Sequence, residues 1–361
     1  MNKFINEKVI IFLPTLTGGG AEETFVKLAN YLNECEYDAT LLVGTNKTSN
    51  IYEKKIINKI KVIDSSRIRY SFVQIFNYLK TVRPDVVIST LWYANIIIFL
   101  ICKFLGIKTI LREAGLDYRA NKGILNYLKI LSMKYVYNNS NKTVVISDYL
   151  KKDLTDNLSI NPSRITQIYN PVKSYIEQSN LKKVDLDQYF PNANKETKYV
   201  VCASRLDKIK GVDYLIESFK NLRNENVKLL ILGDGIEKEN YKDLINKHQL
   251  EGNVYLCGWV ENVYDFIFSC DAYVSPSRFE GLGNAYIAAQ LLNKKCLSSN
   301  IDASVEINNI FNAGMVFNFN KNNLSEQLIN LLSSPKTEIL NVNLFSEDYC
   351  FDKYKEILET I

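Results

Sequence analysis

Short apolar strands alternate with amphipathic helical stretches along almost the whole chain of 361 residues. Helical stretches such as Glu22–Asn33, Val212–Leu222 and Asn284–Leu292 lie between most of the strands. The predicted strands are Val9–Leu13, Ala39–Val43, Val86–Thr90, Lys108–Leu111, Thr143–Ile146, Tyr199–Ala203, Lys228–Leu232, Val254–Cys257, Ala272–Ser275, Lys295–Ser298 and Met315–Phe317. Because parallel neighbours in a sheet must be joined by a crossover, this alternation predicts an α/β protein with parallel sheets covered on both faces.

The length predicts two domains, because single hydrophobic cores stop growing beyond roughly 250–300 residues. Two series of strands and helices indicate two Rossmann-like lobes. The change of lobe falls near Asn170-Pro171, which is followed by a polar, poorly periodic stretch over residues 173–198. We predict an N-terminal domain over residues 1–170, a C-terminal domain over 171–345, and a final helix within 346–361 that packs back on the first domain.

Composition excludes several classes of protein. The seven cysteines are scattered without a Cys-x-x-Cys pair, and His248 is the only histidine, which argues against a zinc site, a disulfide framework and a Ser-His-Asp triad. The start of the chain lacks the apolar run of a secretory signal. The most apolar stretch, Val86 to Cys102, fits a strand and a buried helix from about Tyr93 to Leu105 better than a membrane span. We expect a cytoplasmic protein.

Positive charge gathers in the first half of the chain. Residues 1–170 carry 23 Lys and Arg against 14 Asp and Glu, whereas the remainder carries 21 against 26. The stretch Lys122 to Lys142 also interleaves lysines with apolar residues at helical spacing. These features suit an anionic acceptor or peripheral contact with an anionic membrane, and they suit an ordinary solvated surface equally well. The basic residues are dispersed and form no nucleic-acid recognition module.

The strongest local motif follows the predicted strand Tyr199–Ala203. Arg205, Lys210 and Gly211 come directly before a helical pattern. A guanidinium, an ammonium and the N–H groups of a helix start then face one point, where they would hold a diphosphate. The motif therefore predicts chemistry on a phosphorylated leaving group.

Further glycine-containing loops follow other predicted strands. They are Gly18-Gly19-Gly20-Ala21-Glu22, Leu232-Gly233-Asp234-Gly235, Gly258-Trp259-Val260 and Glu280-Gly281-Leu282-Gly283-Asn284. Their spacing is neither Gly-x-Gly-x-x-Gly nor that of a Walker loop, which disfavours those dinucleotide and ATP sites. All lie at the carboxyl ends of strands, where open α/β sheets place their ligands.

With these motifs the chain resembles the retaining GT-B glycosyltransferases of glycosyltransferase family 4, also called group 1. The likeness runs from the Gly18 loop through Asn170-Pro171 to at least Glu306, and its most specific element is Arg-Leu-x-x-x-Lys-Gly at Arg205 joined to the Glu280 loop. The resemblance implies two lobes with a cleft between them, the first on the acceptor side and the second binding a nucleotide-sugar.

The resemblance also implies roles for individual residues. Arg205 and Lys210 would hold the diphosphate, and Glu280 would accept hydrogen bonds from hydroxyls of the donor sugar. Retention in this family is thought to use attack from the face of departure, with the leaving phosphate helping to deprotonate the acceptor, so no protein nucleophile is required. Two fixed cations beside a helix start would stabilise the leaving group without a metal, so neither a metal nor a cofactor is expected. Trp259 and Val260 would lie near the base, and the loop with Gly19 and Gly20 would face the cleft from the first lobe. The remaining expected donor contacts are Gly233, Gly281, Leu282, Gly283 and Asn284.

Two positions depart from the family pattern. Many members carry a second glutamate eight residues after the first, assigned to the ribose, where this chain has Ala288. Many also place a histidine in the first-lobe cleft, where this chain reads Leu111-Arg112-Glu113-Ala114-Gly115. Arg112 or Glu113 could face the donor or acceptor there instead, or the two could form an ion pair at the surface of the lobe.

These observations predict a retaining glycosyltransferase that moves a sugar from a nucleotide-diphosphate sugar to a saccharide, with a lipid-linked acceptor at the inner face of the membrane. Its place would be in surface polysaccharide or glycan biosynthesis. A GT-B sugar-nucleotide epimerase and a non-catalytic sugar-nucleotide-binding or scaffold protein remain alternatives.

Overall fold

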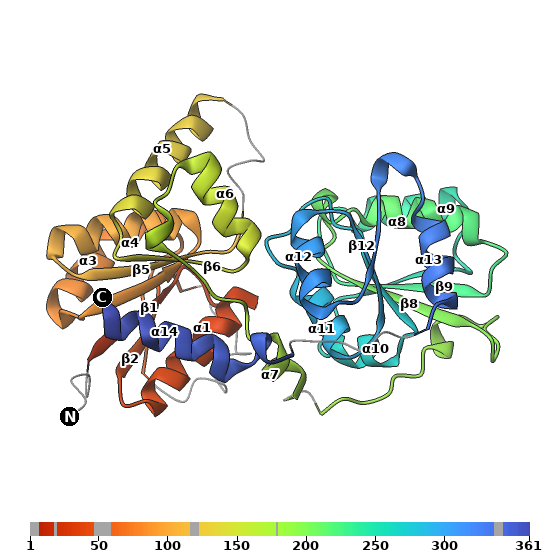
Figure 1. Ribbon diagram of the computed structural model, residues 1–361, viewed down its shortest axis with the longest axis horizontal. Coiled ribbons are helices and arrows are strands. Elements are labelled where there is room, and N and C mark those ends of the chain that lie inside the picture. Colours follow the sequence, from red (N-terminus) through yellow and green to blue (C-terminus); the bar gives the residue numbers. More distant parts are fainter. Residues whose placement is uncertain (1–6, 18–19, 47–58, 116–122, 178–179, 336–341) are drawn as a thin grey trace. The chain divides into compact units, whose positions relative to one another are not determined.

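The computed structural model describes residues 7–17, 20–46, 59–115, 123–177, 180–335 and 342–361. The chain forms two compact units, of which the first combines residues 1–170 with 348–361 and the second comprises residues 171–347. Each unit has its own parallel sheet and its own helices (Figure 1). The fold is therefore α/β, as the alternation of strands and helices predicts.

Unit 1 contains a seven-stranded parallel sheet in the order β3-β2-β1-β4-β5-β6-β7. Val9 of the central strand β1 pairs with Ala39 of β2 and with Val86 of β4. The strands are β1 Lys8–Leu13, β2 Asp38–Val43, β3 Ile60–Val62, β4 Val86–Thr90, β5 Lys108–Glu113, β6 Lys142–Val145 and β7 Ile165–Gln167. The helices are α1 Gly20–Glu34, α3 Phe72–Val82, α4 Trp92–Leu105, α5 Ile124–Asn139, α6 Asp148–Leu158 and α14 Glu347–Thr360.

Helices cover both faces of this sheet, with α1 and α14 on one face and α3 and α4 on the other (Figure 1). Ile10, Phe12 and Val87 of the sheet pack with Leu79 of α3 and Ile98 of α4 in one buried cluster. The predicted combination of a strand and a helix over the most apolar stretch is confirmed by β4 and α4. In the part of the chain that the structure describes, no helix combines the length and apolar character needed to span a bilayer.

The last helix, α14, packs on unit 1. The ring of Phe351 lies 5.5 Å from that of Tyr31 in α1, and Tyr31 donates a hydrogen bond to Asp352. Lys108 at the start of β5 donates to the main-chain oxygen of Ile361 at 3.0 Å. The end of the chain is thus part of the unit that its beginning forms.

Unit 2 contains a six-stranded parallel sheet in the order β10-β9-β8-β11-β12-β13. Strand β8 lies between β9 and β11, because Val200 pairs with Leu229 on one side and Ala272 on the other. The strands are β8 Lys198–Ala203, β9 Val227–Leu232, β10 Val254–Gly258, β11 Ala272–Ser275, β12 Lys295–Ser299 and β13 Met315–Phe317. The helices are α7 Val172–Glu177, α8 Val212–Ser218, α9 Lys238–Lys247, α10 Val263–Ser269, α11 Asn284–Leu291, α12 Asp302–Phe311 and α13 Leu324–Ser333.

The observed elements differ from the predicted ones mainly at edges and ends. Two three-residue strands, β3 and β7, were not predicted, and each forms an edge of the sheet in unit 1. The helix predicted over Val212–Leu222 ends earlier, because α8 gives way to a 3₁₀ turn at Phe219–Leu222. A second 3₁₀ turn, Lys208–Lys210, lies between β8 and α8 and carries the predicted phosphate-binding lysine.

Candidate functional site

The candidate site of unit 2 lies at the carboxyl ends of β8 and β11. From β8 the chain builds β9 and β10 on one side of the sheet and then crosses back to β11 on the other side. The loops that leave β8 and β11 therefore diverge, and such a switch point is where open α/β sheets bind their ligands. Lys210 follows β8 and Glu280 follows β11.

Lys210 and Glu280 form an ion pair in this place. The Lys210 Nζ lies 2.6 Å from Glu280 Oε1, and the two side chains are only 16% and 18% exposed. Ser277 donates a second hydrogen bond to the same oxygen at 2.7 Å. An ammonium and a carboxylate from segments 70 residues apart thus meet at a half-buried point, where charge is screened less than at the surface.

Arg205 stands apart from this pair. Its guanidinium lies 3.4 Å from the Asp207 carboxylate, and 79% of its side chain is exposed. An exposed pair of this kind adds little stability, so Asp207 does little to hold the guanidinium in place. The sequence predicts that Arg205 and Lys210 face one point, and the structure shows Lys210 beside Glu280 while Arg205 extends into solvent.

Glycines allow the loops of this site to pack closely. Gly211 has a φ of +65°, and a Cβ there would lie 2.0 Å from the main-chain oxygen of Pro276. Gly233 has a φ of +130°, and a Cβ there would lie 1.9 Å from the main-chain oxygen of Ser204. Both positions need glycine for its conformation and for space, so contact between loops already explains Gly233, which was predicted as a donor contact.

The other predicted donor residues lie in different environments. Trp259 is exposed and Val260 half-buried in the loop after β10. Leu282, which was predicted as a donor contact, is buried. Gly281 is half-buried, and Gly283 has a φ of +86°. Asn284 begins α11, and Gly20 begins α1. Gly19 lies outside the described residues.

Position 288 offers no polar group. Ala288, at the position where the family resemblance leads to the expectation of a second glutamate, is fully buried within α11.

The structure corrects the expectation for Arg112 and Glu113. Both are buried, and they are the last two residues of β5, which runs two residues beyond the predicted end. Arg112 donates to Thr90 Oγ1 at 3.1 Å and to Asn170 Oδ1 at 2.7 Å. Glu113 accepts a hydrogen bond from Tyr137 at 2.5 Å. These contacts hold both residues in the interior of unit 1, so the alternative of an ion pair at the surface of the lobe is wrong.

Glu113 also organises the chain that follows it. Its Oε1 accepts hydrogen bonds from the main-chain N–H groups of Ala114 at 3.0 Å and Gly115 at 3.1 Å. Burial is the main reason that the pKa of the Tyr137 hydroxyl is raised, and the neighbouring Glu113 carboxylate adds to it. The hydroxyl therefore keeps its proton and continues to donate to Glu113.

Sequence reasoning missed two residues of the site in unit 2. Ser277 contacts the Glu280 carboxylate, and Arg278 contacts both the Lys208 carbonyl and Asp213. Both lie in the loop that ends at Glu280, so their proximity to a predicted site residue was the available signal. The partners of Arg278 lie in the 3₁₀ turn Lys208–Lys210 and in α8, and they could not be inferred from spacing.

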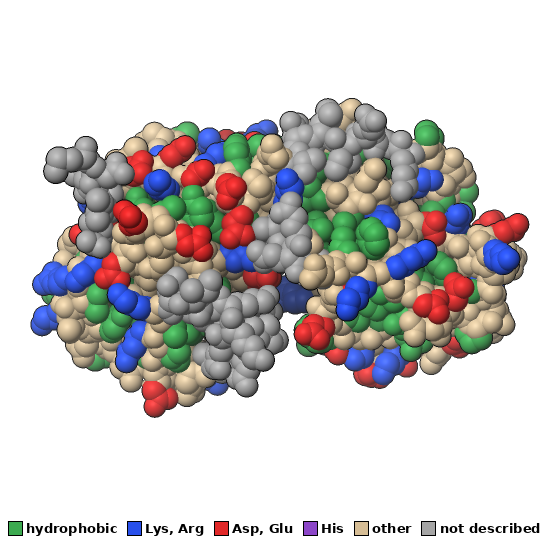
Figure 2. Space-filling model, turned by 90° about the horizontal axis from the view of Figure 1, so that it is seen from below, with side chains coloured by type: hydrophobic (Ala, Val, Ile, Leu, Met, Phe, Trp, Pro, Cys, Tyr) green, Lys and Arg blue, Asp and Glu red, His purple; other side chains and the backbone are tan. Residues whose placement is uncertain are grey.

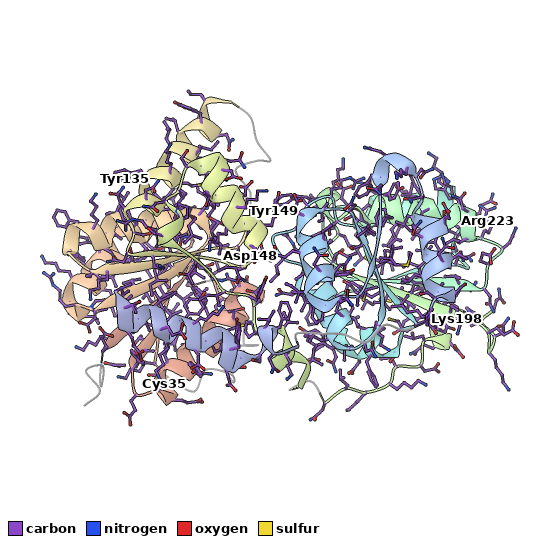
Figure 3. All side chains as sticks on the ribbon, in the orientation of Figure 1. Cys35, Tyr135, Asp148, Tyr149, Lys198 and Arg223 are labelled. Carbon is purple, nitrogen blue, oxygen red and sulfur yellow. The ribbon has the colours of Figure 1, made fainter. Side chains whose placement is uncertain are left out.

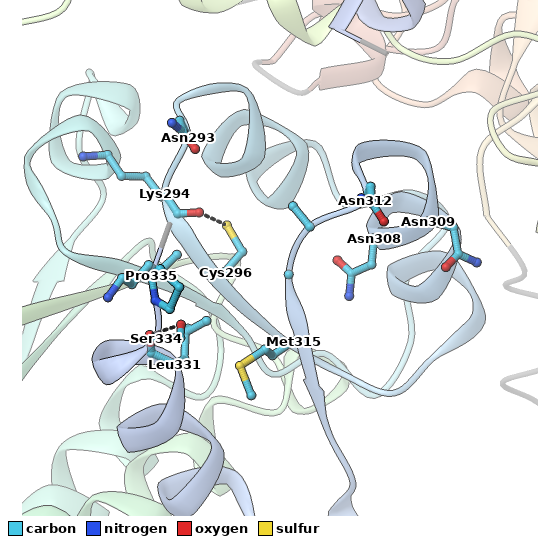
Figure 4. Close-up of a pocket in the computed structure, with 13 residues that line it drawn as sticks. Asn293, Lys294, Cys296, Asn308, Asn309, Asn312, Met315, Leu331, Ser334 and Pro335 are labelled. Atoms are coloured by element: carbon cyan, nitrogen blue, oxygen red, sulfur yellow. Dashed lines mark hydrogen bonds between the residues drawn. The ribbon is translucent and has the colours of Figure 1, made fainter. Parts of the chain in front are cut away.

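A cavity of about 310 Å³ lies elsewhere in unit 2. Lys295 and Met315, the first residues of β12 and β13, help to line it (Figure 4). The cavity therefore lies at the amino ends of the strands, whereas Lys210 follows the carboxyl end of β8. Lys294 beside it donates to the main-chain oxygen of Cys270 at 3.1 Å. The cavity is therefore separate from the loops described above. Within the described ranges, no group of three or more His, Cys, Asp or Glu side chains is placed to hold a metal ion.

Two family models match the chain. Residues 18–174 match glycosyltransferase family 4, and residues 185–341 match the glycosyl transferases of group 1.

Three relatives match over different spans. An uncharacterized glycosyltransferase of Methanocaldococcus jannaschii is 32% identical over 180 residues, which are 49% of this chain and 44% of that protein, so the chain spans less than half of this relative. The N-acetylgalactosamine-N,N'-diacetylbacillosaminyl-diphospho-undecaprenol 4-alpha-N-acetylgalactosaminyltransferase of Campylobacter jejuni is 27% identical and covers 78% of this chain and 77% of its own. An amylovoran biosynthesis glycosyltransferase of Erwinia amylovora is 24% identical, with 78% of each chain covered.

A solved structure shares the fold over the full chain. Anabaena HepE, in complex with UDP and glucose, superimposes with a TM-score of 0.76 at 13% identity, covering 99% of this chain and 100% of its own. The two parallel-sheet units are those of the GT-B fold.

Proposed function

Because the chain belongs to the group 1 and family 4 glycosyltransferases, which include polysaccharide-building enzymes, we propose that it moves a sugar from a nucleotide-diphosphate sugar to a saccharide with retention of configuration. The observation that carries this proposal is the half-buried pair of Lys210 and Glu280 at the switch point of unit 2. It combines a cation for a phosphate with a carboxylate for sugar hydroxyls.

The proposed reaction breaks the bond between the anomeric carbon and a phosphate oxygen. The acceptor hydroxyl forms the new bond to that carbon, its proton passes to the leaving phosphate, and a nucleoside diphosphate departs. Lys210 would stabilise the negative charge that develops on the phosphate, and the exposed guanidinium of Arg205 would close onto the same group. Glu280, held by Ser277, would orient the sugar through its hydroxyls.

We propose that the reaction needs no metal ion, since two side-chain cations at the end of β8 supply the charge that a bound Mg²⁺ would otherwise provide. Transfer should therefore continue in excess EDTA. Loss of turnover in EDTA that returns with Mg²⁺ would refute this part of the proposal.

The activity test begins with a panel of UDP-, GDP-, ADP- and dTDP-sugars, screened by thermal shift and then by NMR for hydrolysis without acceptor. We expect slow hydrolysis of one donor, and both Arg205→Ala and Lys210→Ala should abolish it while leaving the fold intact. Lys242→Ala is the matched control, because its ammonium pairs with Glu239 on the surface of α9. Normal turnover by Arg205→Ala or Lys210→Ala would defeat the assignment.

One observation favours a second candidate, a non-catalytic protein that binds a sugar-nucleotide. The buried Ala288 leaves no carboxylate at the position that many relatives use for the ribose. Binding of a sugar-nucleotide without hydrolysis or transfer would favour this candidate. Interconversion of the free sugar-nucleotide would instead identify an epimerase.

We also propose a lipid-linked acceptor reached by peripheral contact with an anionic membrane. The support is a set of exposed apolar side chains on α5, formed by Ile124, Leu125, Leu128 and Leu131. These side chains are between 44% and 80% exposed. Lys103 ties α4 to α5 through Tyr135, a residue of α5 labelled in Figure 3, and Lys129 lies 4.0 Å from the Trp92 ring.

Apolar side chains flanked by lysines are the composition of helices that lie in a membrane interface, because the apolar groups enter the lipid while the ammonium groups meet anionic headgroups. The Campylobacter relative is named for a diphospho-undecaprenol-linked substrate, which supports the same kind of acceptor here. On the face of the molecule seen in Figure 2, by contrast, acidic and basic side chains are mixed.

Sedimentation with vesicles tests the contact. The protein should pellet with phosphatidylglycerol vesicles at low salt and remain in solution with phosphatidylcholine vesicles. Leu125→Glu combined with Leu128→Glu should abolish binding, whereas Ile236→Glu, on an exposed apolar residue of unit 2, should not. Absence of wild-type binding to anionic vesicles at low salt would remove the docking proposal.

A further inference from the structure

Two loop segments of unit 2, which carry Lys210 and Glu280, run side by side. The first comprises residues 208–211 and the second residues 276–280. Their main chains are joined by a hydrogen bond from the Arg278 N–H to the Ile209 carbonyl at 2.8 Å. Gly211 brings the first segment so close to the Pro276 carbonyl that no side chain would fit between them. The position of Lys210 relative to Glu280 therefore depends on how these segments are held.

The side chain of Arg278 makes a second connection between the segments. One terminal nitrogen donates to the Lys208 carbonyl and to Asp213 Oδ1, each at 2.7 Å, and the other donates to Asp213 Oδ2 at 2.8 Å. Asp213 lies in the first turn of α8, directly after Gly211 and Val212. The guanidinium also lies 5.6 Å from the ring of Phe319. Arg278 thus contacts one residue before Lys210 in the sequence, Lys208, and one after it, Asp213.

We propose that Arg278 is a positioning residue of the donor site, which fixes the 208–211 segment so that Lys210 meets Glu280 and the diphosphate of the proposed donor. The inference rests on the proposed function. Both terminal nitrogens of Arg278 are bonded to Asp213 and Lys208, so the proposed role of Arg278 is exerted through Lys210.

Arginine is the residue that this role requires. Its planar fork can bond both oxygens of one carboxylate and a neighbouring carbonyl at the same time, whereas an ammonium acts as a compact point charge. Asp213 is the carboxylate partner of this fork, and its hydrogen bond is the main reason that the pKa of Arg278 is raised. A displacement of a catalytic group by about 1 Å can lower a rate by as much as 100-fold.

The test uses the full-length protein and two readouts. The first is kcat/KM for the donor identified in the panel, and the second is the Kd of whichever of UDP, GDP, ADP and dTDP the wild type binds best. Arg278→Ala, Arg278→Lys and Asp213→Asn should each lower kcat/KM about 10- to 100-fold and raise Kd about tenfold, while the melting temperature changes by no more than a few degrees. Asp213→Asn keeps the experiment informative if Arg278→Ala fails to fold.

A double-mutant comparison separates positioning from general support of the fold. If Arg278 acts through Lys210, Arg278→Ala should raise Kd no further in a Lys210→Ala background, whereas a purely structural role would add its full effect there. Arg223→Ala is the matched control, because Arg223 also donates to a main-chain carbonyl, that of His248, on the side of unit 2 where β8 begins at Lys198 (Figure 3).

Each outcome decides the inference. Wild-type kcat/KM and Kd in Arg278→Ala, or the same tenfold change in the Lys210→Ala background, would overturn the positioning role and leave the proposed function standing. A wild-type protein that neither binds a nucleoside diphosphate nor turns over a nucleotide-sugar would overturn the proposed function, and the inference with it.

Discussion

At the scale of single residues, the side chains of Lys210 and Ser277 both contact the Glu280 carboxylate. One of its oxygens accepts hydrogen bonds from both Lys210 and Ser277. The main chain of Ser277 is in turn held by a neighbouring side chain, since the Ser299 hydroxyl donates to the Ser277 carbonyl oxygen. The carboxylate is thus oriented before any donor arrives, which lowers the cost of orienting it in the reaction.

Ser277→Ala should lower kcat/KM by about threefold to tenfold, because a typical hydrogen bond contributes about 1 kcal/mol. Lys210 would still hold the carboxylate, so activity should fall without being abolished. Steady-state kinetics with the identified donor measures the change. Ser334→Ala, which removes a hydroxyl bonded to the Leu331 carbonyl far from the site, is the control and should be silent. A loss as complete as that expected for Lys210→Ala would contradict this division of roles.

Buried thiols make stability depend on pH in the alkaline range. Burial raises the pKa of Cys102, Cys202, Cys257 and Cys270 from 9.0 to about 12. Between these values the folded protein retains protons that the unfolded chain releases. The contribution of these thiols to the free energy of unfolding is therefore complete below about pH 9 and is lost as pH rises toward 12.

Urea unfolding at pH 7.5, 9 and 10.5 should accordingly give a free energy of unfolding that is steady at first and then falls. Replacing the fully buried Cys202 by alanine should make the fall shallower. A free energy of unfolding that stays constant up to pH 10.5 would show that the folded protein holds the thiol protons no more tightly than the unfolded chain does.

Residues at the ends of strands show what sequence can and cannot predict about a site. Lys210 and Glu280 could be predicted to meet because both follow strands of one parallel sheet, and strand ends converge at one edge. Arg112 and Glu113 also follow this pattern, yet they are buried. Their partners, including Tyr137 and Asn170, come from elements 24 and 58 residues away, and only the packing of the whole unit brings them there.

At the scale of elements, the loops after β8, β9 and β11 are held together at glycines. The main chain of one loop occupies the space that a side chain of the next would need, at Gly211 against Pro276 and at Gly233 against Ser204. This packing lets three loops share one edge of the sheet. The positions of these loops are therefore coupled, and a side chain introduced at one would displace another.

A series of alanine substitutions separates strain from lack of space. Gly252→Ala should be nearly neutral, because a Cβ there meets nothing within 4 Å, and Gly106→Ala should cost about 1 kcal/mol through its φ of +71° alone. Gly233→Ala combines a φ of +130° with a contact of 1.9 Å and should cost more than about 3 kcal/mol. Chemical denaturation measures all three. Equal effects at Gly106 and Gly233 would contradict the argument from space.

The elements that sequence reasoning missed share a physical reason. Strand β3 has three exposed residues and β7 has three residues at the other edge of the sheet, so neither carries the long apolar run that marks a buried strand. The central strands carry that run and could be predicted to within about two residues. The early end of α8 could not be predicted, because the residues that follow it remain helical as a 3₁₀ turn.

At the scale of the whole molecule, each unit has its own core, but unit 1 is assembled from two separate parts of the chain. Helix α14 buries Cys350, Phe351, Tyr354, Ile357 and Leu358. Burial of each large apolar side chain stabilises by about 1.5–3 kcal/mol, and a domain has only about 5–15 kcal/mol of net stability. The last helix therefore supplies much of the stability of unit 1.

Deleting residues 348–361 should unfold unit 1 and leave unit 2 folded, because unit 2 lies wholly within residues 171–347. Limited proteolysis with mass spectrometry should recover a resistant fragment close to 171–347 from the shortened protein. Glu356→Ala, on the exposed side of α14, is the control and should leave both units resistant. Equal resistance of both units after the deletion would show that α14 is dispensable.

The return of the chain to its first unit has a consequence for biosynthesis. A ribosome synthesises all of unit 2 before it completes the helix that unit 1 lacks, so the unit that is begun first is finished last. A polypeptide cut short by a premature stop codon would carry a mature second unit beside an incomplete first one, which proteases of the cell would recognise by its exposed apolar surface.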